Sequence, residues 1–370
     1  MKIWKYKRLS ECSNFVSERT SNIAIDNYIS TENMIENRGG VKEAAALPDV
    51  KSTSAYKPND ILLSNIRPYF CKIWFADKKG SCSNDVLVVR AKKEIDSKFL
   101  YYVLSDQNFF NWDSMTSKGT KMPRGTPNAI MKYSVPDIPL PTQKKIASIL
   151  SAYDNLIQNY KKQIEALQTA ASELYKEWFV RFRFPGYQTT QFENGIPVGW
   201  KVALASEVGE FVRGKNITAD EMVEGTIPVI SAGIEPSGYH NESNVDGVSL
   251  TISNSGANAG YLMINYSSIW AADCSYCNTA KSIYFYYEML NNLRVVLFNL
   301  QKGAAQPHVY AKDINKMKVL LPPEDLVQKA NEKISLLHKK IYSLQQQITN
   351  LIQQRDLLLP RLMSGKLEIK

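Results

Sequence analysis

The sequence predicts a mixed α/β (α+β) fold in which two similar globular domains alternate with two long helices. The chain has 370 residues, more than the roughly 250–300 at which a single core stops growing, so we expect at least two domains. Two stretches repeat apolar residues at heptad spacing, and short motifs recur in the same order in both halves. These observations predict a pseudo-twofold internal repeat whose helices form a long antiparallel two-helix coiled coil.

The first globule covers residues 1–141 and reads as strand-rich. Apolar and β-branched runs predict strands at 61–63, 72–75 and 86–89. Apolar residues at helical spacing predict one amphipathic helix over 98–112.

The first long helix is assigned to residues 142–185. From Ile146 the apolar residues advance in alternating steps of three and four, which is a heptad seam. Pro139 and Pro141 argue against an earlier start, with Thr142 as the N-cap, and we expect the helix to end by Arg183.

The second globule covers residues 186–322. Its pattern predicts strands at 249–252, 259–264 and 282–286, followed by a helix over 287–300.

The second long helix is assigned to residues 323–370, where a second heptad seam runs without Gly or Pro from Glu324 to Leu359. Neither apolar seam can stay exposed to water, and a folded segment lies between them, so we expect the two helices to pair within one chain. A coiled coil that joins two chains is the alternative.

The two halves also match in short motifs. Gln143 and Gln328 precede the two seams and are 185 positions apart, half of the 370 residues. Three pairs of motifs recur in the same order: Leu63-Ser64-Asn65 with Ile252-Ser253-Asn254, Ser83-Asn84-Asp85 with Ala271-Ala272-Asp273, and Lys118-Gly119 with Lys302-Gly303. The ordered series indicates a duplicated unit.

The charge is unevenly distributed. The net charge is +9 for the whole chain, with +6 in residues 1–141, +3 in each helical segment and −3 in residues 186–322. A basic surplus favours a polyanionic partner, and we expect the first globule to supply more of any salt-dependent affinity.

Composition narrows the class of protein. Hydrophobic residues make up 44%, which excludes a disordered chain, and no apolar run is long enough to span a membrane. Five scattered cysteines and the lack of an apolar secretory signal predict a cytoplasmic location.

Searches for catalytic and metal-binding motifs find none. The sequence lacks a phosphate-binding Gly-x-x-x-x-Gly-Lys-Ser/Thr loop, a Gly-x-Gly-x-x-Gly element and the Asn/Asp-Pro-Pro-Tyr/Phe element of adenine methyltransferases. Cys274 and Cys277 are interpreted as two buried thiols, with a metal site as the weaker alternative, and His338 as a structural residue of the second seam. We therefore expect no catalytic residue, no metal site and no cofactor in this chain.

Four segments resemble the specificity subunit of type I restriction–modification systems. They are residues 139–157 (PLPTQKKIASILSAYDNLI), 174–186 (LYKEWFVRFRFPG), 195–200 (GIPVGW) and 359–367 (LPRLMSGKL). The resemblance covers the chain in order, although the globules match mainly in layout.

The resemblance implies a division of roles along the chain. Residues 1–141 and 186–322 would be target recognition domains that each read half of a bipartite, asymmetric DNA site, and residues 142–185 and 323–370 would be spacer helices. A helix of about 40 residues spans roughly 60 Å, or about 18 base pairs, as an upper limit for the spacer. Two modification subunits would bring S-adenosylmethionine and methylate adenine, and restriction subunits would use ATP and Mg.

Candidate DNA contacts are polar and basic residues in glycine-containing or asparagine-containing loops, because such loops approach DNA closely and offer directional donors. They are Ser64, Asn65, Arg67, Tyr69, Lys118, Gly119, Thr120, Lys121 and Arg124 in the first globule, and Asn254, Ser255, Asn258, Lys302, Gly303, Gln306 and His308 in the second. Ordinary solvated turns are the alternative interpretation. Tyr175 and Phe179 are candidate docking residues for the modification subunits, against packing inside the helix pair.

Two other functions are weighed against DNA reading by a non-catalytic subunit. One is a self-sufficient, type II-like restriction or methylation enzyme with similar recognition domains. The other is a coiled-coil scaffold that binds only protein.

Overall fold

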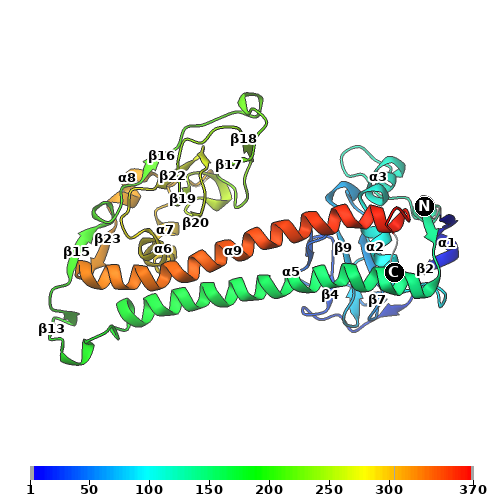
Figure 1. Ribbon diagram of the computed structural model, residues 1–370, viewed down its shortest axis with the longest axis horizontal. Helices are drawn as coiled ribbons and strands as arrows, with labels where there is room; N and C mark the ends of the chain where they lie inside the picture. The colour runs from blue at the N-terminus through cyan, green and yellow to red at the C-terminus, as the bar shows by residue number, and fades with distance from the viewer. Residues whose placement is uncertain (1–3, 304, 368–370) are drawn as a thin grey trace. The chain divides into compact units, whose positions relative to one another are not determined.

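The computed structural model describes residues 4–303 and 305–367, which divide into two compact units (Figure 1). Unit 1 contains Met1–Gln158 and Ile348–Lys370, and unit 2 contains Asn159–Gln347. Both boundaries fall inside the two long helices, α5 (Leu140–Tyr175) and α9 (Glu324–Met363). Each unit therefore consists of one globule and a portion of each long helix.

Unit 1 is built on two four-stranded sheets and a short strand pair. The pair joins β1 (Lys5–Arg8) antiparallel to β12 (Ser134–Asp137). The sheet beneath the helices has the order β2-β11-β8-β9, formed by Ser13–Phe15, Val86–Ala91, Ile61–Ser64 and Ile73–Phe75. The outer sheet has the order β3-β7-β10-β4, formed by Arg19–Thr20, Thr53–Tyr56, Gly80–Cys82 and Tyr28–Ile29. The three strands predicted for this globule are confirmed.

The helix predicted as one segment over 98–112 is two helices, α2 (Ser97–Ser105) and α3 (Gln107–Thr116). Asp106 ends α2 in an extended conformation, and its carboxylate accepts the backbone N–H of Asn108 at 2.7 Å, which caps α3. The remaining helical turns are α1 (Leu9–Cys12), α4 (Pro127–Ile130) and a 3₁₀ turn (Pro68–Phe70). A hairpin joins β5 (Met34–Ile35) to β6 (Gly40–Val41).

The core of unit 1 includes the packing of the two long helices. Ile146 and Leu150 of α5 and Leu359 and Leu362 of α9 are buried in one cluster with Phe99 of α2. The start of α5 thus meets the end of α9, so the helices are antiparallel in this unit. Burial of these apolar stripes removes the exposed seam that the heptad pattern predicts.

Unit 2 repeats the main sheet and the strand pair. β15 (Lys201–Leu204) pairs antiparallel with β23 (Lys318–Leu321). The main sheet has the order β16-β22-β19-β20, formed by Val212–Arg213, Cys274–Cys277, Ser249–Ser253 and Leu262–Asn265. A smaller sheet has the order β18-β17-β21, formed by Gly238–His240, Ile227–Ile230 and Trp270–Ala271. Its β17 and β21 pair in parallel, as β4 and β10 do in unit 1.

The strand predicted at 282–286 is wrong, because this segment begins helix α6 (Ile283–Asn292). Its aromatic and β-branched residues favour a strand locally, but Phe285 and Tyr286 are buried in the core as helical residues, and Asn331 of α9 accepts the Phe285 N–H at 3.1 Å. The helix predicted over 287–300 is the rest of α6 followed by α7 (Arg294–Asn299). The last short helix is α8 (Ala311–Asn315), and a hairpin joins β13 (Phe192–Glu193) to β14 (Ile196–Pro197).

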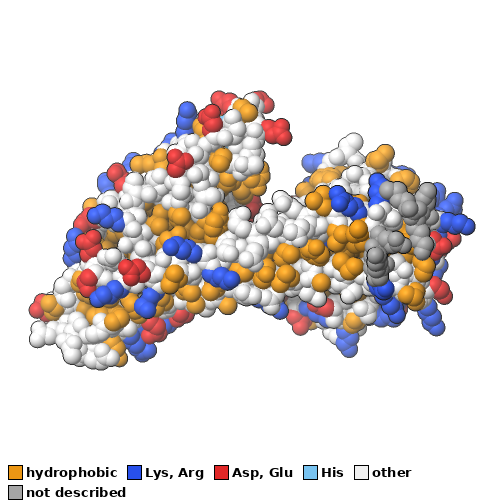
Figure 2. All heavy atoms as spheres, viewed as in Figure 1, with side chains coloured by type: hydrophobic (Ala, Val, Ile, Leu, Met, Phe, Trp, Pro, Cys, Tyr) orange, Lys and Arg blue, Asp and Glu red, His pale blue; other side chains and the backbone are white. Residues whose placement is uncertain are grey.

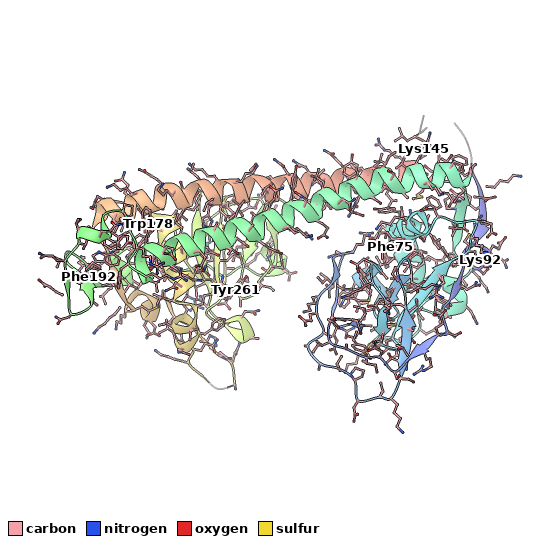
Figure 3. All side chains as sticks on the ribbon, turned by 90° about the horizontal axis from the view of Figure 1, so that it is seen from below. Phe75, Lys92, Lys145, Trp178, Phe192 and Tyr261 are labelled. Atoms are coloured by element: carbon pink, nitrogen blue, oxygen red, sulfur yellow. The ribbon has the colours of Figure 1, made fainter. Side chains whose placement is uncertain are left out.

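The core of unit 2 contains the opposite ends of the same two helices. Trp178 and Phe179, in a π-helical turn (Lys176–Val180) after α5, are buried with Ala330 and Ile334 of α9. Figure 3 labels Trp178 where this turn meets the unit 2 globule. The helices are therefore antiparallel in this unit as well.

Burial along the helices follows a repeat of 184 residues rather than the expected 185. Leu150 and Ile334 are both fully buried, and 184 positions also separate the buried Ile157 and Ile341. The helix α5 starts at Leu140 instead of Thr142, because proline is tolerated in a first helical turn and Pro141 occupies it. Within the part of the chain that the structure describes, no helix is long and apolar enough to cross a membrane.

Candidate nucleic-acid interface

The first candidate loop of unit 1 is residues 118–125, which follows α3. Lys118 and Arg124 exchange both backbone hydrogen bonds, at 2.9 and 2.8 Å, and close the loop. Gly119 has φ +96°, a conformation that favours glycine. Lys118 and Lys121 are exposed, so the closed loop presents two cations to solvent.

The second candidate stretch, residues 64–69, lies directly beside this loop. The Gly125 N–H donates to the Asn65 carbonyl at 3.0 Å, and the Arg67 N–H donates to the Pro123 carbonyl at 2.8 Å. The two predicted segments, residues 64–69 and 118–125, therefore lie side by side and form one surface, which we call the unit 1 loop pair.

Two guanidinium groups lie on the unit 1 loop pair. Nη1 of Arg124 lies 3.0 Å from Oδ1 of Asp85, and about half of the arginine side chain, 52%, is exposed. Arg67, at φ 49°, holds its guanidinium 5.9 Å from the centre of the Phe70 ring, and its Nε has no hydrogen-bond partner among the described residues. Arginine offers several donors in a fixed plane, so both groups can bind phosphate or a base edge.

Beneath the loop pair lies a buried carboxyl group. Asp113 of α3 is fully buried, and neither of its carboxylate oxygens has a hydrogen-bond partner within residues 4–303 and 305–367. A Cβ on Gly125 would lie 2.5 Å from Oδ1 of Asp113 and 2.9 Å from Oδ1 of Asn65. Burial raises the pKa of Asp113 from its ordinary 3.8 to about 7.

Unit 2 builds the same frame from residues 253–258, 302–303 and 305–309, the unit 2 loop pair. Lys302 and His308 exchange backbone hydrogen bonds at 2.9 and 2.8 Å, and Gly303 has φ +94°. The Gly256 N–H donates to the Pro307 carbonyl at 3.0 Å. These contacts match those of Lys118, Arg124, Gly119 and their neighbours, so the backbone frame is duplicated.

The side chains on the two frames differ. His308 occupies the position of Arg124 and lies stacked with Tyr310, with the ring centres 6.1 Å apart. Nζ of Lys302 pairs with Asp313 at 2.7 Å, and Asp273 accepts the Ser255 hydroxyl. The unit 2 loop pair therefore carries fewer cations than its counterpart, which agrees with the charge difference between the globules.

Two predicted contact residues are internal instead. Ser64 is 3% exposed and its hydroxyl donates to the Ile66 carbonyl, while Asn254 is 7% exposed and accepts the Ser275 hydroxyl at 2.7 Å. They shape their loops and are not presented to a ligand.

All of the other predicted contact residues are at least partly exposed: Asn65, Arg67, Tyr69, Lys118, Gly119, Thr120, Lys121, Arg124, Ser255, Asn258, Lys302, Gly303, Gln306 and His308. Pattern reasoning missed Asp85 and Asp273. Only their place in the repeated motif after β10 and β21 marks them in the sequence.

The docking role expected for Tyr175 and Phe179 is corrected by their burial. Each side chain is 6% exposed, and their rings lie 5.7 and 5.0 Å from that of Phe285, measured between centres. They pack the end of α5 and the turn after it against α6 inside unit 2.

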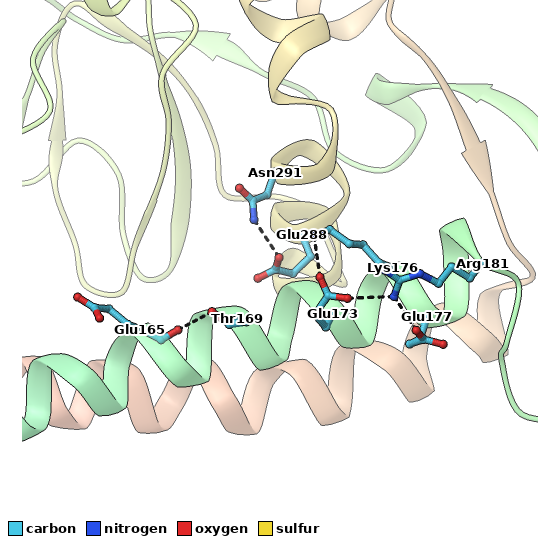
Figure 4. Close-up of polar contacts among 8 residues, drawn as sticks. All are labelled: Glu165, Thr169, Glu173, Lys176, Glu177, Arg181, Glu288 and Asn291. Carbon is cyan, nitrogen blue, oxygen red and sulfur yellow. Dashed lines mark hydrogen bonds and ion pairs between the residues drawn. The ribbon is translucent and has the colours of Figure 1, made fainter. Parts of the chain in front are cut away.

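Figure 4 shows the polar contacts near the end of α5 and on α6. Glu173 accepts from Lys176 at 2.8 Å and from Arg181 at 2.9 Å, and Glu288 accepts from Asn291 at 3.1 Å. A cavity of about 580 Å³ lies beside them, lined in part by Lys176, Glu288 and Tyr261.

The face shown in Figure 2 carries mixed basic and acidic side chains, so no single charged patch dominates it.

His338, Cys274 and Cys277 are buried inside unit 2. His338 is 1% exposed, with Nε2 lying 3.1 Å from Oε1 of Glu288 and Nδ1 2.8 Å from the Tyr266 hydroxyl. Cys274 and Cys277 are buried in different apolar clusters. Among the described residues, no group of three or more His, Cys, Asp or Glu side chains could hold a metal ion.

Comparison with known proteins agrees with the duplicated frame. The model of the type I restriction modification DNA specificity domain matches residues 1–169 and 197–354. The chain is 27% identical over 308 residues to a type I restriction enzyme specificity subunit of Methanocaldococcus jannaschii, covering 75% of this chain and 71% of that protein. It is 28% identical over 306 residues to a protein named as a type I specificity subunit in Mycoplasma pneumoniae, covering 78% of each.

A solved structure shares the fold. The type I restriction–modification S subunit from M. genitalium superposes with a TM-score of 0.61 and 18% identity, covering 100% of this chain and 98% of that one.

Proposed function

The chain belongs to the family of type I restriction–modification DNA specificity subunits, and we propose that it reads a bipartite, asymmetric DNA target. Each unit reads one half-site through its loop pair. The bound chain directs adenine methyltransferase subunits and restriction subunits to that target.

The main support for this proposal is that both units contain the same backbone frame but carry different side chains on it. Lys118 with Arg124 and Lys302 with His308 make the same backbone hydrogen bonds, so both frames can approach DNA in the same way. Because Arg124 and His308 differ in side-chain shape and donor geometry, the frames suit two different base sequences. This difference supports a target whose two half-sites are not alike.

The charged loop residues supply both kinds of contact that a DNA reader needs. Lys118 and Lys121 are suited to phosphate oxygens, which position the protein without reading sequence. Arg67 and Arg124 can also bind guanine through two hydrogen bonds, and Gln306 can bind adenine in the same manner.

The chemistry of methylation and cleavage is assigned to partner subunits. Within the described part of the chain, no group of three or more His, Cys, Asp or Glu side chains could bind a metal ion. The sequence also lacks the Asn/Asp-Pro-Pro-Tyr/Phe element of adenine methyltransferases. We place S-adenosylmethionine on two modification subunits and ATP and Mg on restriction subunits, with the complex in the cytoplasm.

Methylation mapping tests the proposal. Genomes from cells with and without this chain, both expressing the modification subunits, are compared for methylated adenines. One bipartite motif that depends on the chain is expected. An unchanged methylation map would contradict the proposal, and Mg-dependent cleavage by the purified chain would favour a self-sufficient enzyme instead.

A further inference from the structure

The ion pair of Arg124 with Asp85 is placed on the unit 1 loop pair itself. Nη1 and Oδ1 are 3.0 Å apart, and the arginine and aspartate side chains are 52% and 34% exposed. Exposed ion pairs add little to folding stability, because solvent screens them and ordering two side chains costs entropy. Stability alone therefore gives no reason for this pair.

Hydrogen bonds hold the backbones of both residues of the pair. The Asp85 carbonyl accepts the Asn65 N–H at 2.8 Å, and the Asp85 N–H donates to Oγ of Ser83 at 3.2 Å. Arg124 exchanges two backbone hydrogen bonds with Lys118. The two backbones are therefore held in place, and the ion pair favours one direction for the guanidinium between them.

Asp85 engages one part of the guanidinium and leaves the rest available. A guanidinium carries five N–H donors in one plane, and the ion pair joins Nη1 to one carboxylate oxygen. Guanine presents O6 and N7 side by side in the major groove and accepts two parallel hydrogen bonds from such a group. An arginine whose plane is already set loses less entropy on binding.

We infer that Asp85 is a positioning residue that orients Arg124 to read a guanine in the half-site bound by unit 1. The inference rests on the proposed function and adds to it a named base and a specificity-determining pair. Removal of the aspartate leaves the cation in place but frees its orientation.

Unit 2 has the same frame without the pair. Asp273 takes the place of Asp85, since its carbonyl accepts the Asn254 N–H at 3.3 Å, as Asp85 accepts that of Asn65. His308 stands where Arg124 does, and the Asp273 carboxylate accepts the Ser255 hydroxyl instead. The second half-site is therefore expected to lack a guanine read in this way.

Selection from randomised duplex DNA tests the inference with the full chain and its modification subunits. Asp85→Asn is compared with Arg124→Gln, which removes the guanidinium and its paired donors to guanine O6 and N7. Both variants are expected to lose guanine preference at one shared position, by about fivefold or more. The half-site read by unit 2 is expected to stay unchanged, which controls for folding.

Three results would overturn the inference. Unchanged base preference in Asp85→Asn would show that the aspartate does not position the reader. A uniform loss of affinity for all sequences in Arg124→Gln, with the base preference unchanged, would place that arginine on a phosphate. If the unmodified chain selects no motif, the proposed function fails as well, and this result is distinct from the first two.

A gain of preference is the complementary test. His308→Arg places a guanidinium on the unit 2 frame near Asp273, so a new guanine preference at one position of the second half-site is expected. Affinity that rises evenly for all sequences would count against the inference, because it would show a charge effect only.

Discussion

Replacement of Asp113 by asparagine is expected to remove a pH-dependent loss of stability from unit 1. The carboxyl is fully buried beneath the loop pair, and neither oxygen has a hydrogen-bond partner among the residues described. Burial raises its pKa to about 7, because the charged form is poorly solvated. The protonated form is therefore the one that the folded chain favours.

The sign and size of the effect follow from linkage. The unfolded carboxyl releases its proton near pH 3.8 and the folded one near pH 7, so between these values the folded state binds more protons and stability falls as pH rises. The contribution is fully present below the unfolded pKa and is lost as pH rises through the folded pKa. Each pKa unit corresponds to about 1.4 kcal/mol, so the loss between pH 5 and pH 8 is about 2–3 kcal/mol.

Urea unfolding and hydrogen exchange of the full chain from pH 5 to pH 8 measure this loss. Asp113→Asn is expected to flatten the pH dependence by that amount, with the exchange difference concentrated in residues 107–126. The exposed Asp49, replaced by asparagine, is a control with the same charge change. Equal pH dependence in wild type and Asp113→Asn would refute the reasoning.

A second variant separates charge from shape. Counting from the two Lys-Gly motifs, Leu297 is the equivalent of Asp113 in unit 2, and it is also fully buried. Asp113→Leu therefore copies a side chain that the same frame already accommodates, and it should also remove the pH dependence.

Three other predictions follow from packing and charge. Gly125→Ala should destabilise unit 1 by about 1–3 kcal/mol in urea unfolding, since the new Cβ meets the Asp113 carboxylate; unchanged stability would show that this approach is not tight. Ile334→Ala should cost about 2–5 kcal/mol in the same assay because its side chain is fully buried in the unit 2 core, and a loss below 1 kcal/mol would contradict that packing. Lys118→Gln together with Lys121→Gln should lower the slope of log affinity against log salt by about 2 without changing the selected motif. A changed motif would instead make these lysines base readers.

The sequence was informative wherever one local pattern decides the structure. The heptad seams lead to α5 and α9 because helical periodicity is a property of neighbouring turns. Local patterns fail where packing overrides propensity, as at residues 282–286, where an aromatic run forms the start of α6 on the core of unit 2. Tyr175 and Phe179 show the same limit, because a seam pattern does not tell which partner covers an aromatic ring.

The repeated organisation, the two long helices, the surplus of cations in the first globule and the loops rich in donors are all readable from the sequence. They depend on periodicity, composition and motif order, which need no distant contact. Only the tertiary structure brings residues 64–69 against residues 118–125, sets Asp85 beside Arg124 and buries Asp113 beneath them. These contacts join segments far apart in the chain, and pairing between distant segments is decided by how strands and helices pack.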